Sequence, residues 1–314
     1  MALRVAFFGT PAFAVPTLEH LAHSPHAVVG VITQPDRPRG RGQQISEAPV
    51  KALAAALALP VLQPERLARE PFEASFTALR ADIGVVAAYG RILPDWLLAT
   101  PRLGLINVHA SLLPRYRGAS PVHRAVIGGD AETGVTIMRV VKALDAGPML
   151  SRVRVAIGDD DTTTEVESML ARLGAELLMA TLNDVEHGRA IATAQDETQV
   201  TYAPKLTKAE GLVDWRRPAR DVHNLVRGLW PWPHASAFLD GTRFILHRSC
   251  LSARPVALPA GTILAASASE GLHVACGDGA IEILELQLEG KRVMTARDAM
   301  ASRALTAGAR FSSP

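Results

Sequence analysis

The stretch Leu3-Arg4-Val5-Ala6-Phe7-Phe8 is an almost continuous apolar run that ends in Gly9-Thr10-Pro11. Hydrophobicity that is continuous rather than alternating is typical of a parallel strand covered on both faces. Further runs of this kind occupy residues 27–33, 83–88 and 105–109, and helical patterns lie between the first three runs, at 15–23, 49–59 and 72–80. This βαβ alternation predicts a doubly wound, Rossmann-like α/β domain with a mostly parallel sheet.

Two more strands are predicted at 134–141 and 150–157, joined by a loop that contains Asp145, and a long helix follows at 162–187. After residue 188 the pattern weakens into polar residues without an apolar face. We therefore expect a first domain at 1–188, a linker at 189–206 and a second domain at 207–314.

The second domain is predicted to be a small β-barrel. Short strand patterns occupy residues 235–239, 243–249, 261–265, 271–276 and 280–287, after a helical pattern at 218–229. Asp240-Gly241 and Asp278-Gly279 are hairpin turn signals between them. Because closure of a sheet removes its exposed edges, a five-stranded barrel of the oligonucleotide-binding (OB) type fits this strand count.

Composition excludes several classes of protein. The chain has 314 residues, of which 48% are hydrophobic and 20% charged, so it is neither disordered nor a coiled coil. Its apolar runs are too short for a membrane helix, and the N-terminal run is too short for a signal peptide. Cys250 and Cys276 have neither a zinc-ligand spacing nor a disulfide framework. A soluble, cytoplasmic protein is expected.

The run at 105–109 carries two polar residues, Asn107 and His109. Because side chains alternate along a strand, both lie on one face at the carboxyl end, where open α/β sheets bind their ligands. A core histidine with satisfied hydrogen bonds is the alternative reading. Asp145 lies in a turn, where a lone Asp is most often a turn former.

Taken together, these motifs resemble the folate-dependent formyltransferases. The resemblance rests on Asn107-Val108-His109, on Ser111-Leu112-Leu113-Pro114 with Gly118, and on Asp145 in its L-D-x-G turn. It extends to the segments 8–11, 33–38, 40–42, 85–90, 134–138, 195–197, 201–203, 214–215, 231–233 and 259–263. Two departures from the commonest pattern are Ala110, where glycine is expected, and Ala146-Gly147-Pro148, where Thr-Gly-Asp is expected.

The resemblance implies transfer of a formyl group from 10-formyltetrahydrofolate to the α-amino group of initiator methionyl-tRNA. Asn107 would donate its amide to the oxyanion that forms, and His109 would shuttle the proton. Asp145 would hold the imidazole and stabilise its charged form. This chemistry requires no metal, and no metal site is expected.

The resemblance also implies binding residues. The first domain would be catalytic and bind folate through Ser111, Leu112, Leu113 and Pro114, with Tyr89 and Gly90 from a neighbouring strand. The carboxyl-terminal part of the chain would bind tRNA through Lys205 and Lys208, with Arg216, Arg217 and Arg220 as further phosphate contacts. The resemblance further implies that the polar loop carrying Arg37 and Arg41 is an arm that contacts the acceptor end of tRNA, with Arg41 as its main contact. The alternative reading of this loop is a solvated surface loop. A monomer without membrane contact is expected.

Other readings remain open at this point. A glycinamide ribonucleotide or amino-sugar nucleotide formyltransferase shares the chemistry with a different acceptor, and a formyltetrahydrofolate hydrolase replaces the amine by water. A non-catalytic RNA-binding module is a third class. Asp159-Asp160-Asp161 suggests either a magnesium site or, more simply, the acidic start of the helix that follows.

Overall fold

The computed structural model describes residues 2–39, 44–67, 70–301 and 305–312, with the backbone alone described at 37–39 and 44–46. The chain forms two compact units. The first comprises residues 1–121, 133–155 and 167–203, and the second comprises residues 122–132, 156–166 and 204–314. Residues 189–203, in the range expected to be a linker, are thus part of the first unit.

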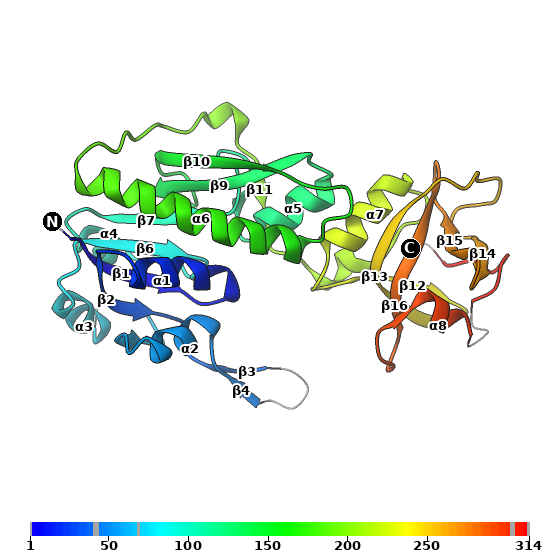
Figure 1. Ribbon diagram of the computed structural model, residues 1–314, viewed down its shortest axis with the longest axis horizontal. Coiled ribbons are helices and arrows are strands. Elements are labelled where there is room, and N and C mark those ends of the chain that lie inside the picture. The colour runs from blue at the N-terminus through cyan, green and yellow to red at the C-terminus, as the bar shows by residue number, and fades with distance from the viewer. Residues whose placement is uncertain (1, 40–43, 68–69, 302–304, 313–314) are drawn as a thin grey trace. The chain divides into compact units, whose positions relative to one another are not determined.

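The first unit is built around one sheet, whose strands alternate with helices along the chain (Figure 1). The elements from the N-terminus to residue 203 are β1 (Arg4–Gly9), η1 (Ala12–Ala14), α1 (Val15–Ala22), β2 (Ala27–Ile32), β3 (Arg37–Arg39), β4 (Gln44–Ser46), α2 (Pro49–Ala56), β5 (Val61–Leu62), α3 (Phe72–Ala78), β6 (Ile83–Ala87), α4 (Asp95–Ala99), β7 (Leu105–His109), β8 (Arg117–Gly118), α5 (Pro121–Gly128), β9 (Glu132–Arg139), β10 (Met149–Ala156), α6 (Thr163–Glu186), η2 (Glu197–Gln199) and β11 (Tyr202–Ala203).

Seven strands form this sheet in the order β10-β9-β7-β6-β1-β2-β5. The pairs β1–β2, β1–β6, β6–β7 and β2–β5 are parallel, whereas β7 and β9 are antiparallel. The mostly parallel, Rossmann-like sheet predicted from the continuous apolar runs is confirmed. β10 lies at an edge and alternates in burial, with Arg152 and Arg154 exposed, as suits an edge strand that must not pair with another chain.

An aromatic cluster covers part of this sheet. The rings of Phe8 and Tyr89 meet edge to face with centroids 5.6 Å apart, and Phe76 packs against Phe8 at 5.7 Å and against Trp96 at 6.2 Å. Edge-to-face pairs of this kind add about 1 kcal/mol each beyond the burial of apolar area. The cluster holds α3 and α4 to the ends of β1 and β6.

The second unit contains an antiparallel sheet, confirming the strand-rich domain that was predicted. Its elements are η3 (Lys208–Gly211), α7 (Ala219–Gly228), β12 (Ala235–Leu239), β13 (Thr242–Ser252), β14 (Ile263–Ser267), β15 (Gly271–Ala275), β16 (Ala280–Leu288), β17 (Met294–Thr295) and α8 (Ala296–Met300). The strands run in the order β12-β13-β16-β15-β14, and the short β17, which no sequence pattern indicated, pairs with β16.

Residues 308–312 connect the two outer strands of this sheet. The amide of Phe311 donates to the carbonyl of Gly261 just before β14, and the amide of Ser312 donates to the carbonyl of Phe238 in β12. The Phe311 ring stacks on Trp215 at 5.4 Å and meets Phe244 edge to face at 5.6 Å. The segment therefore covers both strand edges and completes the apolar core of the unit.

The loop before α6 is fastened to α7 within the second unit. His223 Nε2 donates to the carbonyl of Asp159, and Arg227 Nη1 donates to the carbonyls of Gly158 and Asp161. The Glu165 carboxylate accepts hydrogen bonds from the amide and hydroxyl of Thr162. This capping arrangement explains why α6 begins where it does, and it lowers the pKa of Glu165.

The three acidic side chains in this loop each have a protein partner. Asp159 forms an ion pair with Arg220, Asp160 faces His223, and Asp161 accepts the amide of Gly158. Within the described residues, these carboxylates do not converge into a group that could hold a metal ion. Likewise, no helix in the described part of the chain is both long and apolar enough to cross a membrane.

Candidate active site

β7 places Asn107 and His109 on the same face of the first unit's sheet. The strand pairs with β6 on one side and β9 on the other, so its carboxyl end lies well inside the sheet. His109 is buried and Asn107 is partly exposed. In the described part of the chain, the Asn107 side chain has no hydrogen-bond partner, so its amide is available to a ligand.

Both ring nitrogens of His109 face protein groups. Nε2 lies 3.0 Å from the carbonyl oxygen of Tyr116, and Nδ1 lies 3.7 Å from Oδ2 of Asp145. Because a carbonyl oxygen only accepts, Nε2 carries the hydrogen and donates it to Tyr116. Nδ1 is the ring nitrogen that faces the Asp145 carboxylate.

The loop between β9 and β10 presents Asp145. Its φ is 46°, a left-handed conformation that costs a residue with a Cβ about 1 kcal/mol or more and persists only where its surroundings hold it. The loop packs closely on β9, because a Cβ at Gly147 would lie 1.8 Å from the carbonyl oxygen of Arg139. Asp145 Oδ2 accepts the amide of Gly118 at 2.8 Å.

Three residues that the sequence reasoning did not single out complete this arrangement. Tyr116 contributes its carbonyl, and Gln195 Nε2 donates to the carbonyls of Asp145 at 2.7 Å and Gly147 at 2.8 Å. Arg117 donates to Gln195 Oε1 through Nε and Nη2, at 3.0 and 2.8 Å. Two features of the sequence could have pointed to these residues. Arg117 adjoins Gly118, and Gln195 belongs to the 195–197 segment of the family pattern.

The residues expected to bind folate differ in how far their side chains are exposed to solvent. Ser111, Leu113 and Pro114 are buried and Leu112 is partly exposed. The Tyr89 side chain lies in the aromatic cluster, so it is the backbone of Tyr89 and the exposed Gly90 that reach the end of β6. The Tyr89 carbonyl is already held by Gln34 Nε2 at 2.7 Å.

The residues expected to bind tRNA fall into three groups. Arg41 lies outside the described residues, and Arg37 is described by its backbone alone, in the hairpin of β3 and β4. Lys205 and Lys208 are exposed and make no ion pair with a described residue. Three further arginines each pair with a carboxylate, at Arg216–Asp214, Arg217–Asp221 and Arg220–Asp159.

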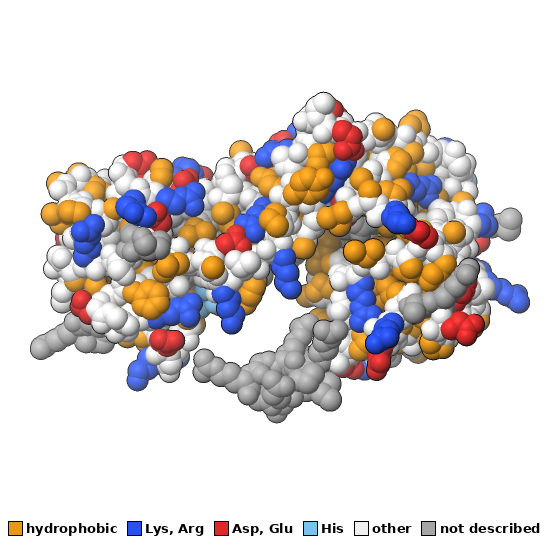
Figure 2. Space-filling model, turned by 180° about the vertical axis from the view of Figure 1, so that it is seen from behind, with side chains coloured by type: hydrophobic (Ala, Val, Ile, Leu, Met, Phe, Trp, Pro, Cys, Tyr) orange, Lys and Arg blue, Asp and Glu red, His pale blue; other side chains and the backbone are white. Residues whose placement is uncertain are grey.

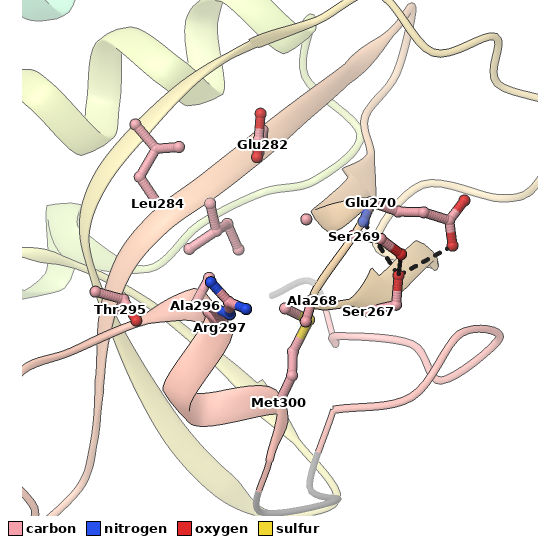
Figure 3. A pocket seen from close by; sticks show the side chains of 12 residues that line it. Ser267, Ala268, Ser269, Glu270, Glu282, Leu284, Thr295, Ala296, Arg297 and Met300 are labelled. Atoms are coloured by element: carbon pink, nitrogen blue, oxygen red, sulfur yellow. Dashed lines mark hydrogen bonds between the residues drawn. The ribbon is translucent and has the colours of Figure 1, made fainter.

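Basic side chains are dispersed on the face drawn in Figure 2, where the described Lys and Arg residues alternate with acidic and apolar ones. A pocket in the second unit is lined by the β14–β15 turn, β16 and α8, and includes Ser267, Glu270 and Arg297 (Figure 3). None of the sequence-predicted site residues lines it. This pocket is therefore not the site that the sequence predicts at the end of β7.

The chain belongs to the formyl transferase family. The Formyl transferase family model matches residues 3–182, and the model of the formyl transferase C-terminal domain matches residues 205–304. The family resemblance seen in the sequence is thereby confirmed.

Individual relatives match over almost the whole chain. The methionyl-tRNA formyltransferase of Methylococcus capsulatus is 48% identical over 304 residues, covering 96% of this chain and 98% of that protein. The protein of the same name from Paracoccus denitrificans is 47% identical over 303 residues, covering 96% of this chain and 98% of the relative. Among solved structures, the N-formyltransferase of Helicobacter canadensis, in complex with folinic acid and dTDP-3-aminofucose, shares the fold with a TM-score of 0.69 at 17% identity, covering 90% of this chain and 98% of that one.

Proposed function

We propose that this protein transfers the formyl group of 10-formyltetrahydrofolate to the α-amino group of initiator methionyl-tRNA. The observation that carries the proposal is the match to methionyl-tRNA formyltransferases at 47–48% identity over both units. The position of Asp145 beside the imidazole of His109 supports the chemistry. On this proposal the protein works in the cytoplasm, as a monomer.

The reaction proceeds by addition and elimination at the formyl carbon. The neutral α-amino group attacks that carbon, forming a C–N bond and a tetrahedral intermediate with an oxyanion and a positively charged nitrogen. α-Amino groups titrate near pH 8, so a substantial minority is already neutral at pH 7 and a strong base is unnecessary. The intermediate then loses a proton from the incoming nitrogen and breaks its bond to N10 of the folate.

His109 carries that proton between the two nitrogens. Nε2 is occupied by the Tyr116 carbonyl, so Nδ1 accepts the proton from the incoming amine and delivers it to N10 as the C–N10 bond breaks. The Asp145 carboxylate, 3.7 Å from Nδ1, stabilises the imidazolium during the transfer. Histidine ends the cycle in the protonation state in which it began.

Asn107 stabilises the oxyanion. Its amide is partly exposed at the end of β7, and it has no partner among the described residues that would have to be displaced. A preorganised donor of this kind contributes about 3 kcal/mol to the transition state in a site from which water is excluded. No metal is required, because the oxyanion is met by a hydrogen-bond donor and the nucleophile is a neutral amine.

Folate binding draws on the segments that end β6 and β7. Gly90 and the backbone of Tyr89 follow β6, and Ser111 to Pro114 follow β7. Ile92, 85% exposed, and Leu144, 59% exposed, adjoin these segments and the Asp145 turn along the chain, and they offer apolar surface for the folate rings to cover.

Binding of tRNA draws on the exposed Lys205 and Lys208 of the second unit and on Arg37 and Arg41 of the first. Lys205 and Lys208 are favoured over Arg216, Arg217 and Arg220, because a phosphate need not break an existing ion pair to reach them.

A transfer assay with alternative acceptors tests the proposal. The purified protein receives labelled 10-formyltetrahydrofolate together with methionyl-tRNA, glycinamide ribonucleotide, an amino-sugar nucleotide or water alone. We expect label on methionyl-tRNA only. Label on the sugar nucleotide, the class of compound bound in the Helicobacter canadensis structure, would identify the protein as a sugar formyltransferase, and release of free formate would identify a hydrolase.

A further inference from the structure

Arg117 is a buried cation at the edge of the candidate active site. Its residue is 3% exposed, and burial of an unpaired charge would be costly. Nη2 donates to Glu197 Oε1 at 2.7 Å, and Nε and Nη2 donate to Gln195 Oε1. We call Arg117, Gln195 and Glu197 the Arg117 network. Gln195 and Glu197 lie 78 and 80 residues from Arg117 along the chain, yet all three residues belong to the first unit.

The network fixes the orientation of the Gln195 carboxamide. A guanidinium only donates, so the oxygen of Gln195 must face Arg117, and the amide nitrogen then faces the carbonyls of Asp145 and Gly147. Both amide hydrogens have an acceptor. Glu197 completes the network from the surface, where its side chain is 71% exposed and the hydrogen bond from Arg117 lowers the pKa of its carboxyl group.

The backbone on either side of Arg117 touches the two side chains of the proposed proton relay. The carbonyl of Tyr116 accepts from His109 Nε2, and the amide of Gly118 donates to Asp145 Oδ2. The side chain of Arg117 returns through Gln195 to the backbone of Asp145 itself. The segment 116–118 thus contacts His109 once and Asp145 twice. It reaches the Asp145 carboxylate directly, and it reaches the Asp145 main chain through Gln195.

Resting on the proposed function, we propose that Arg117 and Gln195 are positioning residues that hold Asp145, in its left-handed conformation, against Nδ1 of His109. The position of the Asp145 loop matters because the Asp145 carboxylate lies 3.7 Å from Nδ1. A small movement of the loop therefore decides whether the carboxylate stabilises the imidazolium. Misplacement of a catalytic group by about 1 Å costs up to about 100-fold in rate. Neither Arg117 nor Gln195 touches the reacting atoms in this scheme.

Gln195→Glu is the primary test. It keeps the oxygen that faces Arg117 but replaces the donor nitrogen by an oxygen aimed at two carbonyls. We expect kcat for methionyl-tRNA to fall about tenfold or more, with KM for both substrates within about twofold of wild type. Gln199→Glu is the matched control, because Gln199 is exposed in the same segment and, among the described residues, its side chain bonds only to the local Asp196. It should retain wild-type kcat.

A double-mutant cycle separates positioning from a general structural role. If Gln195 acts through Asp145, then Gln195→Glu introduced into an Asp145→Asn protein lowers kcat less than about twofold further. A full, multiplicative loss in that background would overturn the proposal. So would a Gln195→Glu protein that melts earlier than wild type but retains its kcat once folded.

Amide hydrogen exchange provides a readout that needs no substrate. The Gly118 amide is protected by Asp145 Oδ2, so Gln195→Glu should raise its exchange rate about tenfold, while the amide of Phe7 in β1 stays protected. Faster Gly118 exchange in a protein that does not formylate methionyl-tRNA would refute the proposed function and leave the positioning role standing. Unchanged Gly118 exchange would refute the positioning role by itself.

Glu197→Gln supplies the test if Gln195→Glu does not fold, because Glu197 is exposed and its replacement keeps the shape of the side chain. Loss of the charge weakens the hold on Arg117. We expect a two- to fivefold lower kcat, on the order of one weakened charge-assisted hydrogen bond transmitted through Gln195, together with faster exchange at Gly118. Wild-type values of both would overturn the proposal.

Discussion

The main-chain amide of Gly118 donates a 2.8 Å hydrogen bond to Oδ2 of Asp145, across 27 residues of sequence. Gly118 has a φ of 125°, and a Cβ there would lie 2.8 Å from the carbonyl oxygen of Ala203 in β11. The position thus needs glycine for two reasons, backbone conformation and close approach. Tyr116, two residues earlier, accepts a hydrogen bond from His109 through its carbonyl. The backbone at 116–118 is therefore hydrogen-bonded to both residues of the proposed proton relay, His109 and Asp145.

Gly118→Ala is expected to impair both stability and catalysis. The left-handed conformation and the clash with Ala203 together cost about 1–3 kcal/mol in the free energy of unfolding. Displacement of the amide from Asp145 should lower kcat about tenfold or more. Urea unfolding and steady-state kinetics measure the two effects.

Gly241→Ala is the control for that experiment, since Gly241 has a φ of 77° but nothing within 4 Å of its added Cβ. It should lose about 1 kcal/mol of stability and keep its kcat. If both variants retain full kcat after allowance for the folded fraction, the coupling between Gly118 and Asp145 plays no part in the reaction.

Asn107→Ala and Asp145→Ala are expected to lower kcat about 100-fold or more each, because in the proposed mechanism each removes a group that stabilises charge formed in the transition state. The melting temperature of Asn107→Ala should stay nearly unchanged, since the Asn107 side chain has no partner among the described residues. Asp145→Ala loses the hydrogen bond from the Gly118 amide and should therefore be destabilised by about 1 kcal/mol. Calorimetry and single-turnover kinetics test this. Lower stability with normal activity in the folded fraction would make both residues structural.

Asp82 is expected to make stability depend on pH in the acid range. The amide of Arg4 and the guanidinium of Arg102 donate to its carboxylate at 2.8 and 2.7 Å, and these hydrogen bonds hold its pKa below the ordinary value. A depressed pKa in the folded protein means a contribution that is complete above the unfolded pKa, near 4, and is lost as pH falls through the folded pKa.

Asp82→Asn should therefore lower the free energy of unfolding by about 1–2 kcal/mol at pH 7, and by less as the pH falls below the unfolded pKa, near 4. Asp240→Asn is the control, as it lies at an exposed hairpin turn of the second unit. Urea titrations between pH 2.5 and pH 7 give the comparison, and a pH-independent difference between wild type and Asp82→Asn would contradict this assignment.

Cys276 is expected to resist alkylation in the folded protein. Burial raises the pKa of its thiol to about 12, so almost none of the reactive thiolate exists at pH 8. Cys250 is partly exposed, and its pKa is also raised by burial, though less. Iodoacetamide at pH 8 should modify Cys250 slowly and Cys276 only after denaturation, as peptide mass spectrometry can show. Rapid modification of native Cys276 would mean that the second unit opens locally.

Strand positions were predictable wherever the strand buries a continuous apolar run. β1, β2, β6 and β7 lie within the predicted ranges, except that β1 ends one residue later, at Gly9, and β12 spans the predicted residues 235–239. β8 and β11 were not predicted, because two residues carry no periodic signal and their pairing of Arg117 with Tyr202 depends on distant segments. The pairing of β17 with β16 went unrecognised for the same reason.

Sequence alone determined that Asn107 and His109 share a face at the carboxyl end of a buried strand, because alternation along a strand is a local property of the backbone. Only the tertiary structure decided which imidazole nitrogen meets Asp145, that Tyr116 occupies the other, and that Arg117 and Gln195 support the Asp145 loop. Those relations depend on where separate loops meet once the sheet has formed. Such meetings follow from packing of the whole unit and leave no pattern in any one stretch of the chain.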